Sequence, residues 1–275
     1  MSLTLGTGPF GERPAGRFDV LERPEAVLYW ESLPYRVRAV FERETVVDSR
    51  AVKLLHESGR LPLFYFPETD VRVDLIEPSG REEEQERKGR AVWLTLRVGE
   101  RVAPDAAWRF EEPVETASFL AGHVALVWRA LDEWFVEDEQ VFGHPRDPYS
   151  RIDVYTSSRH VRVLRDGEVL ADTRRAKALV ETGLPVRWYI PPEDVRTELL
   201  VPSSTRTRCA YKGSATHWSV QVGDRVVDDL VWAYLEPELD AQPVRDHYCF
   251  YNERVDLELD GEPEQRPQTQ WSRDD

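Results

Sequence analysis

The chain contains an internal repeat. A shift of 124 positions lays residues 37–132 over residues 161–256 without a gap, and roughly thirty of the paired positions are identical, which is far beyond chance. Self-similarity at one fixed spacing is typical of a duplicated structural unit, and 275 residues are enough for two compact cores. The sequence therefore predicts two tandem copies of one domain, at residues 25–143 and residues 150–262.

Three segments lie outside these copies. Residues 1–24 are rich in Gly and Pro and are expected to form a leader arm. Their stretch Gly6-Thr-Gly8-Pro-Phe-Gly11 has the spacing of a dinucleotide-binding loop, but Pro14 follows, so no long helix begins here to hold a pyrophosphate. A linker is predicted at residues 144–150, where two prolines oppose regular structure. Residues 263–275 are predicted to be a loose tail.

Short alternating segments dominate each copy. Residues 35–47 and 159–171 alternate apolar and polar side chains about a turn, so each copy is expected to open with a hairpin. Behind Asp48 and Asp172, apolar residues recur at helical spacing as far as Gly59 and Gly183, which predicts a helix of about nine residues. The other apolar segments have the pattern of strands. The predicted fold is mainly β (α+β), with about seven strands and one short helix in each copy.

Composition argues against several classes of partner. The formal net charge of −15 opposes binding to nucleic acid or to an anionic membrane surface. No run approaches the ~18 apolar residues of a spanning helix, and the N-terminus lacks the features of a secretion signal, so we expect a cytoplasmic protein. The two cysteines, Cys209 and Cys249, are too few for a paired-cysteine zinc site, and we expect neither a metal nor a cofactor.

Three motifs carry a resemblance to a known family. They are Tyr-Phe-Pro-x-x-Asp-Val at residues 65–71, Cys-x-Tyr-Lys-Gly-x-Ala at residues 209–215, and Trp232-x-Tyr234. With them the chain resembles a tandem member of the bacterial family called domain of unknown function 427 (DUF427). The resemblance implies a β-tent-like fold, similar to a group that includes zinc-binding and small-ligand-binding domains. The paired CxxC zinc ligands of that group are absent here.

The family has also carried a nucleotidyltransferase label. Nucleotidyl transfer of the common kind needs two or three carboxylates that converge on Mg²⁺. The nearest pattern, Asp256-Leu-Glu258-Leu-Asp260, places three acids on one face of a strand beside the C-terminal tail. A strand that faces solvent explains this alternation better, so the motifs do not support the label.

The densest group of reactive side chains is the stretch from Cys209 to Trp218. Cys209 is a candidate nucleophile or redox thiol, although cysteine often only fills space. Lys212 and Gly213 recur in the first copy as Lys88-Gly89, which favours either a contact with a ligand or a structural salt bridge of Lys212 with Asp194 or Glu181. Sequence alone leaves both alternatives open.

Aromatic and histidine side chains surround this stretch in the sequence. Several of them must build the core, since a small β domain needs large apolar residues. Tyr and Trp with polar tips also suit a half-apolar ligand pocket, while His217 on a strand is more typical of a hydrogen-bonded core residue. The candidate ligand-binding residues are Tyr189, Asp194, Tyr211, His217, Trp218 and Trp232.

These observations favour a protein that binds an unidentified small molecule through a pocket in its second copy. The first copy has Gln85 and Arg87 where the second has Cys209 and Tyr211, so we expect it to be mainly structural. One alternative is an enzyme that uses Cys209 or Lys212 in catalysis. The other is a non-catalytic module whose acidic face binds a protein partner.

Overall fold

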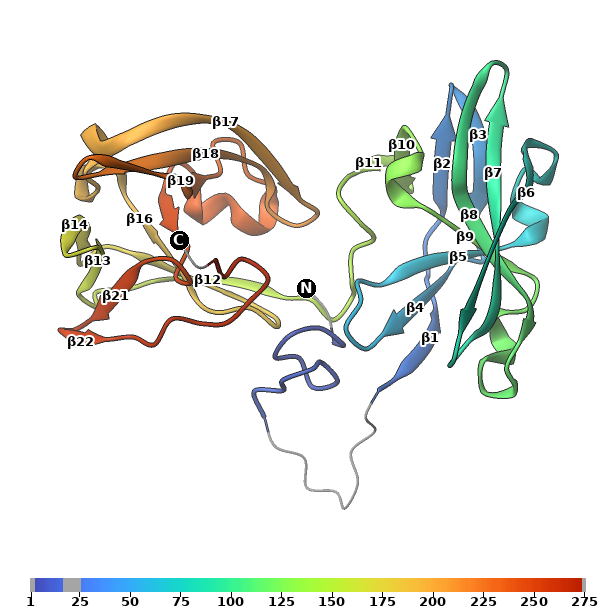
Figure 1. The fold of residues 1–275 in the computed structure, drawn as a ribbon, viewed down its shortest axis with the longest axis horizontal. Helices are drawn as coiled ribbons and strands as arrows, with labels where there is room; N and C mark the ends of the chain where they lie inside the picture. The colour runs from blue at the N-terminus through green and yellow to red at the C-terminus, as the bar shows by residue number, and fades with distance from the viewer. Residues whose placement is uncertain (1–2, 17–25, 274–275) are drawn as a thin grey trace. The chain divides into compact units, whose positions relative to one another are not determined.

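A computed structural model of the chain describes residues 3–16 and 26–273 (Figure 1). The chain divides into two compact units, one formed by residues 26–146 and the other by residues 147–273 together with residues 3–16. The first unit holds the first copy of the repeat and the second unit holds the second, and we call them the first and second domains. No helix among the described residues is long and apolar enough to cross a membrane.

The first domain consists of two antiparallel sheets. A seven-stranded sheet has the order β1-β4-β5-β9-β8-β7-β6, and a four-stranded sheet has the order β11-β10-β2-β3. The strands are β1 (Leu28–Ser32), β2 (Val37–Phe41), β3 (Glu44–Ser49), β4 (Lys53–Glu57), β5 (Leu63–Pro67), β6 (Ile76–Gln85), β7 (Gly89–Val98), β8 (Arg101–Pro113), β9 (His123–Leu126), β10 (Glu133–Val136) and β11 (Glu139–Val141).

The second domain repeats this arrangement. Its seven-stranded sheet has the order β12-β15-β16-β20-β19-β18-β17, and its four-stranded sheet has the order β14-β13-β21-β22. The strands are β12 (Ile152–Thr156), β13 (Val161–Arg165), β14 (Glu168–Thr173), β15 (Lys177–Glu181), β16 (Arg187–Ile190), β17 (Leu200–Cys209), β18 (Gly213–Val222), β19 (Arg225–Ala233), β20 (Tyr248–Phe250), β21 (Asp256–Leu259) and β22 (Glu262–Pro263). Both copies are thus mainly β, as predicted, and their described residues form eleven strands each rather than about seven.

The central strands of the seven-stranded sheet of each domain are buried on both faces. In the second domain, Trp188 and Ile190 of β16 pack into the core between the two sheets. Tyr189, which lies between them on the strand, points to the opposite face and packs against Ala241 and Val244 of η7 (Leu239–Val244). Successive side chains of a strand point to opposite faces, so strand β16 supplies both cores.

The predicted nine-residue helix is wrong in both copies. Its residues form the end of β3 and strand β4 in the first domain, and the corresponding strands β14 and β15 in the second. The Ser49 hydroxyl accepts a hydrogen bond from the Ala51 N–H at 3.0 Å, so it closes a turn between two strands instead of capping a helix. In the part of the chain that the structure describes, helical structure is confined to 3-10 segments, namely η1 (Glu68–Asp70), η2 (Val73–Leu75), η3 (Glu115–Leu120), η4 (Trp128–Ala130), η5 (Pro192–Asp194), η6 (Thr197–Leu199) and η7.

The described part of the leader, residues 3–16, is a compact series of turns in the second domain. Gly8 N–H donates to the Leu5 carbonyl and Gly11 N–H donates to the Gly8 carbonyl. A Cβ on Gly6 would lie 2.5 Å from the carbonyl oxygen of Gly183, so this glycine allows close packing of two backbone segments. No strand precedes these glycines and no helix follows them within residues 3–16, in contrast to a dinucleotide-binding loop.

The two copies differ by one residue in their last hairpin. Trp134 of β10 pairs with Ala39, whereas Leu257 of β21 pairs with Val163. Ala39 and Val163 are related by the shift of 124, so Leu257 occupies the place of Trp134 in the sheet. A shift of 124 would instead lay Trp134 on residue 258, one position after Leu257.

Candidate functional site

Lys212 forms a buried ion pair with Glu181. Only 10% of the Lys212 side chain and 3% of the Glu181 side chain are exposed, and the Nζ atom contacts Oε2. Lys88 and Glu57 make the same contact in the first domain, at 2.5 Å. Of the two salt-bridge partners considered for Lys212, the structure selects Glu181, and the retained lysine has a structural explanation in both copies.

The glycine after this lysine is required by the backbone. Gly213 has φ +92°, and a Cβ there would lie 3.3 Å from the Glu236 carbonyl oxygen. The preceding Lys212 carbonyl accepts a hydrogen bond from Glu238 N–H at 3.1 Å. Gly89 has φ +96° in the first domain and an even closer approach of 2.6 Å to the Glu112 carbonyl. The Lys-Gly motif therefore joins the β17–β18 turn to the segment after β19.

Tyr189 and Trp232 lie together on the face of the large sheet that is covered by η7. The Trp232 Nε1–H donates to the Tyr189 hydroxyl at 3.0 Å, and Tyr65 and Trp108 make this bond in the first domain at 3.3 Å. Burial raises the pKa of Tyr189 well above its ordinary value, so the phenol is neutral. Cys249 packs in the same cluster, and burial raises the pKa of its thiol as well.

Tyr211 binds the chain's own linker. Its buried hydroxyl accepts a hydrogen bond from the Asp147 N–H at 2.6 Å. The half-buried Cys209 lies at the end of β17, and its Sγ accepts a hydrogen bond from the Tyr211 N–H at 3.4 Å. The presence of Tyr211 in only one copy is thus accompanied by a contact to the segment that precedes that copy.

His217 and Trp218 point to opposite faces of β18. Trp218 packs in the core between the sheets and meets Tyr248 edge to face. His217 is 2% exposed, and its Nε2 is paired with the Thr207 hydroxyl at 2.9 Å. Burial lowers the pKa of His217, which keeps the imidazole neutral near pH 7. The sheet therefore separates Trp218 from Tyr189 and Trp232.

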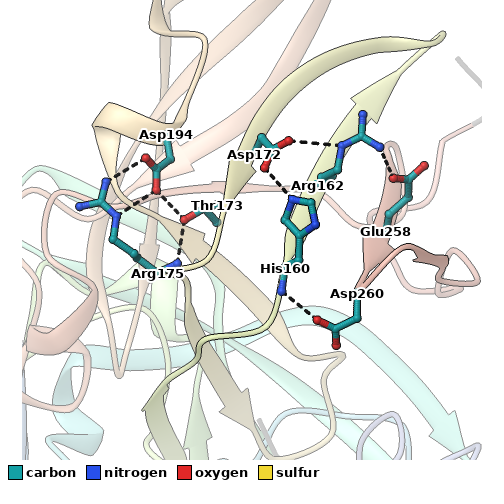
Figure 2. Close-up of polar contacts among 8 residues, drawn as sticks. All are labelled: His160, Arg162, Asp172, Thr173, Arg175, Asp194, Glu258 and Asp260. Carbon is teal, nitrogen blue, oxygen red and sulfur yellow. Dashed lines mark hydrogen bonds and ion pairs between the residues drawn. The ribbon is translucent and has the colours of Figure 1, made fainter.

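Asp194 anchors the turn that follows β16 (Figure 2). It accepts a hydrogen bond from the Thr173 hydroxyl at 2.6 Å and pairs with the Arg175 guanidinium at 2.8 Å. The hydrogen bond from Arg175 holds the pKa of Asp194 below its usual range. Ser49 and Asp70 make the equivalent bond in the first domain, also at 2.6 Å. The retained aspartate is explained by this turn.

The three acids near the C-terminus each pair with an arginine. Arg266 contacts Asp256 at 2.7 Å, Arg162 contacts Glu258 at 2.5 Å, and Arg159 contacts Asp260 at 2.7 Å. Figure 2 shows Glu258 and Asp260 within a chain of polar contacts on the small sheet. Within residues 3–16 and 26–273, no three His, Cys, Asp or Glu side chains gather as a metal site would require.

Sequence reasoning missed another buried ion pair of the second domain, between Arg187 and Glu253. Two hydrogen bonds of 2.7 Å join the side chains, which are 6% and 0% exposed. Burial alone raises the pKa of Glu253, but Arg187 outweighs it and holds the pKa below its usual range. The Thr269 hydroxyl also donates to Glu253 at 2.6 Å, so the tail packs on this pair. The first copy has Leu63 at the position of Arg187, and this change from an apolar residue to a charged one was the sequence signal that could have indicated the pair.

A cavity of about 280 Å³ opens in the second domain beside the core between its sheets. Trp188, Leu257 and Leu259 supply apolar lining, while Arg159, Asn252 and Gln265 supply polar groups. The Asn252 Nδ2–H donates to the Val186 carbonyl at 3.0 Å, which fixes the amide. None of the site residues predicted from sequence lines this cavity.

The tail forms part of the cavity wall. Glu264 N–H donates to the Leu257 carbonyl at 2.7 Å, and Gln265 and Pro267 follow along the lining. Trp271 then lies near Tyr251, with ring centroids 6.4 Å apart. Residues 264–273, predicted to be loose, thus contact the second domain at several points.

In the first domain the equivalent positions are filled by tryptophan. Trp128 and Trp134 stack with ring centroids 4.5 Å apart and an interplanar angle of 4°, and Phe64 lies 6.2 Å from Trp128. Asn252 replaces Trp128, because each is the second residue after the matching strands β20 and β9. Leu257 replaces Trp134, because the two residues pair with equivalent positions of β13 and β2. Two smaller side chains therefore open space in the second domain, and the one-residue offset hides the second replacement from an ungapped comparison.

Comparison with known proteins gives one result about the chain's relationships. A search of curated proteins found no match to the chain. The sequence profile of the family described as domain of unknown function (DUF427) matches it twice, at residues 30–137 and at residues 153–261. These segments coincide with the two copies of the fold. The chain therefore belongs to the DUF427 family and is a tandem member of it.

Proposed function

We propose that the protein binds a small, half-apolar molecule in the cavity of its second domain. The observation that carries this proposal is the replacement of the stacked Trp128 and Trp134 by Asn252 and Leu257 at the same place in the fold. A core that loses large side chains is destabilised unless the space is refilled. A ligand that refills the space would compensate for that loss.

The lining has the composition of a binding site. Trp188, Leu257 and Leu259 provide apolar contacts, and a few polar groups are available to orient a ligand. The volume of about 280 Å³ suits a molecule smaller than most drugs. A cavity of roughly 150 Å³ holds benzene, so this one accommodates a larger ring system.

The side chains around Lys212 are engaged within the domain, which favours the cavity over this loop as the binding site. Lys212 is paired with Glu181, Tyr189 with Trp232, and Tyr211 with Asp147, so these groups already have partners within the domain. Amine chemistry at Lys212 would require the buried ion pair to break, which is costly. We therefore assign this loop to the scaffold and the binding role to the cavity.

Native mass spectrometry of the purified full-length protein tests the proposal. An extra mass that is lost on denaturation is expected in the wild type and absent from Asn252→Trp, which restores the first domain's residue and fills the cavity. Lys212→Met combined with Glu181→Leu is the matched control, because it removes both charges of the loop's buried ion pair and leaves the cavity lining intact. Circular dichroism checks that both variants fold.

Two results would oppose the proposal. If Asn252→Trp retained the extra mass, the ligand would lie outside the cavity. If only the variant with both Lys212→Met and Glu181→Leu lost it while remaining folded, the loop would be the binding site.

A further inference from the structure

The cavity's lining constrains the ligand that it takes, given the binding function proposed above. In the first domain the same space holds two parallel indole rings, with planes 4° apart. Trp188, which lines the cavity, stands at the position of Phe64 and has a larger aromatic ring system. A space beside a tryptophan, at the place where two stacked rings lie in the first domain, favours a planar aromatic ring, since aromatic rings gain from offset stacking or edge contacts.

The charges at the rim distinguish between cationic and anionic ligands. Arg159 lines the cavity, but its Nε donates to the Asp260 carboxylate at 2.7 Å, so its charge is largely compensated. Glu264 also lines the cavity and makes no ion pair with any residue that the structure describes. The remaining local charge is negative, as is the net charge of −15. Both favour a cation over an anion.

From shape and charge together, we infer that the second domain binds a planar bicyclic aromatic amine. The ring system occupies the place of the stacked tryptophans, beside Trp188. The ammonium group lies at the rim toward Glu264, where it gains an ion pair. Among the residues that the structure describes, none donates a hydrogen bond to the Asn252 Oδ1, while the Nδ2–H is used by the Val186 carbonyl. This oxygen accepts a hydrogen bond from a ring N–H.

Four probes separate these features by isothermal titration calorimetry on the full-length protein. Tryptamine has the bicyclic ring and the cation, indole lacks the charge, indole-3-acetate reverses it, and cyclohexylethylamine keeps the cation without an aromatic plane. We expect tryptamine to bind at least about 10-fold more tightly than indole-3-acetate or cyclohexylethylamine. Indole is expected to fall between these limits.

Substitutions at the rim assign the charge effect. Glu264→Gln should weaken tryptamine about 3- to 10-fold, an effect expected of a partly exposed ion pair, and leave indole unchanged. Glu262→Gln is the matched control, because Glu262 is an exposed neighbour on β22 that does not line the cavity. It should leave both affinities unchanged.

The outcomes distinguish this inference from the function on which it rests. If cyclohexylethylamine or indole-3-acetate binds best and Asn252→Trp abolishes that binding, the ligand class is wrong and the cavity remains the site. If none of the probes binds, the ligand class is also refuted. If tryptamine binds Asn252→Trp as tightly as the wild type, both the inference and the proposed function fail.

Discussion

Replacing Lys212 with methionine tests whether the retained Lys-Gly motif is structural. The substitution removes the cation from a pair in which the lysine is 10% and the glutamate 3% exposed, and leaves the Glu181 carboxylate buried without it. Breaking such a pair costs about 3–5 kcal/mol. This is a large part of the ~5–15 kcal/mol that stabilises a typical domain. We therefore expect a marked loss of stability in the second domain.

A double-mutant cycle separates the pair from its surroundings. The variant Lys212→Met with Glu181→Leu removes both charges, and an apolar replacement of a buried pair is commonly neutral or stabilising by about 1–4 kcal/mol. We expect it to be far more stable than Lys212→Met alone, with an interaction energy above about 2 kcal/mol. Urea unfolding monitored by hydrogen-exchange mass spectrometry measures each domain separately.

The first domain supplies an internal comparison. Lys88→Met should destabilise that domain by a similar amount, because Lys88 and Glu57 form the equivalent pair. The reasoning would be refuted if Lys212→Met cost less than about 1 kcal/mol, or if the double variant lost as much stability as both single variants together.

Three further predictions follow from buried polar groups and from the tail. Arg187→Leu leaves the buried Glu253 without its cation, so the pKa of Glu253 rises above its unfolded value of about 4.3. The loss of about 3–5 kcal/mol at pH 7 should therefore shrink as the pH falls through this raised pKa, and further below about 4.3, where the wild type loses its own stabilisation. Equal losses at pH 7 and pH 4 in urea unfolding would contradict this. Burial lowers the pKa of His217, so below about pH 6.5 the unfolded state binds a proton that the folded state does not, and the wild type loses stability. His217→Trp should remove this part of the pH dependence. Thermal melts should show the wild type losing up to about 1.4 kcal/mol per pH unit more than the variant. A chain that ends at residue 263 lacks the part of the cavity wall formed by residues 264–267. Calorimetry should show that this chain binds tryptamine at least about 10-fold more weakly, and unchanged binding would exclude a role for the tail.

Comparison of the two domains explains why some residues are shared. Lys212 and Gly213 serve an ion pair and a tight backbone approach, Tyr189 and Trp232 share a hydrogen bond, and Asp194 anchors a turn. Each has an equivalent with the same geometry in the first domain. Retention between copies therefore marks the scaffold, whereas the cavity arises where the copies differ.

The predicted helix shows the limit of local pattern reading. Ala176, Leu179 and Val180 fit a helical spacing, but a short apolar run is also compatible with a buried strand. Pairing of β15 with both β12 and β16 settles the choice, because each partner satisfies one edge of the strand. The apolar pattern within residues 176–180 does not reveal either pairing.

The sequence by itself determined the duplication, the mainly β fold and the family, because these depend on similarity and alternation along the chain. It also identified Lys212 and Gly213 as residues under a constraint, and it placed Glu181 among the two partners considered for the lysine. It did not distinguish a ligand contact from a salt bridge, since that depends on which charge lies opposite in space.

Only the tertiary structure decided where the cavity lies. Asn252 and Leu257 take the places of Trp128 and Trp134 through strand register, and a one-residue offset conceals the second replacement in the linear sequence. The tail closes the wall through its contacts with Leu257 and Glu253. Cavity formation depends on the volumes of side chains brought together by long-range pairing, and no local pattern encodes that sum.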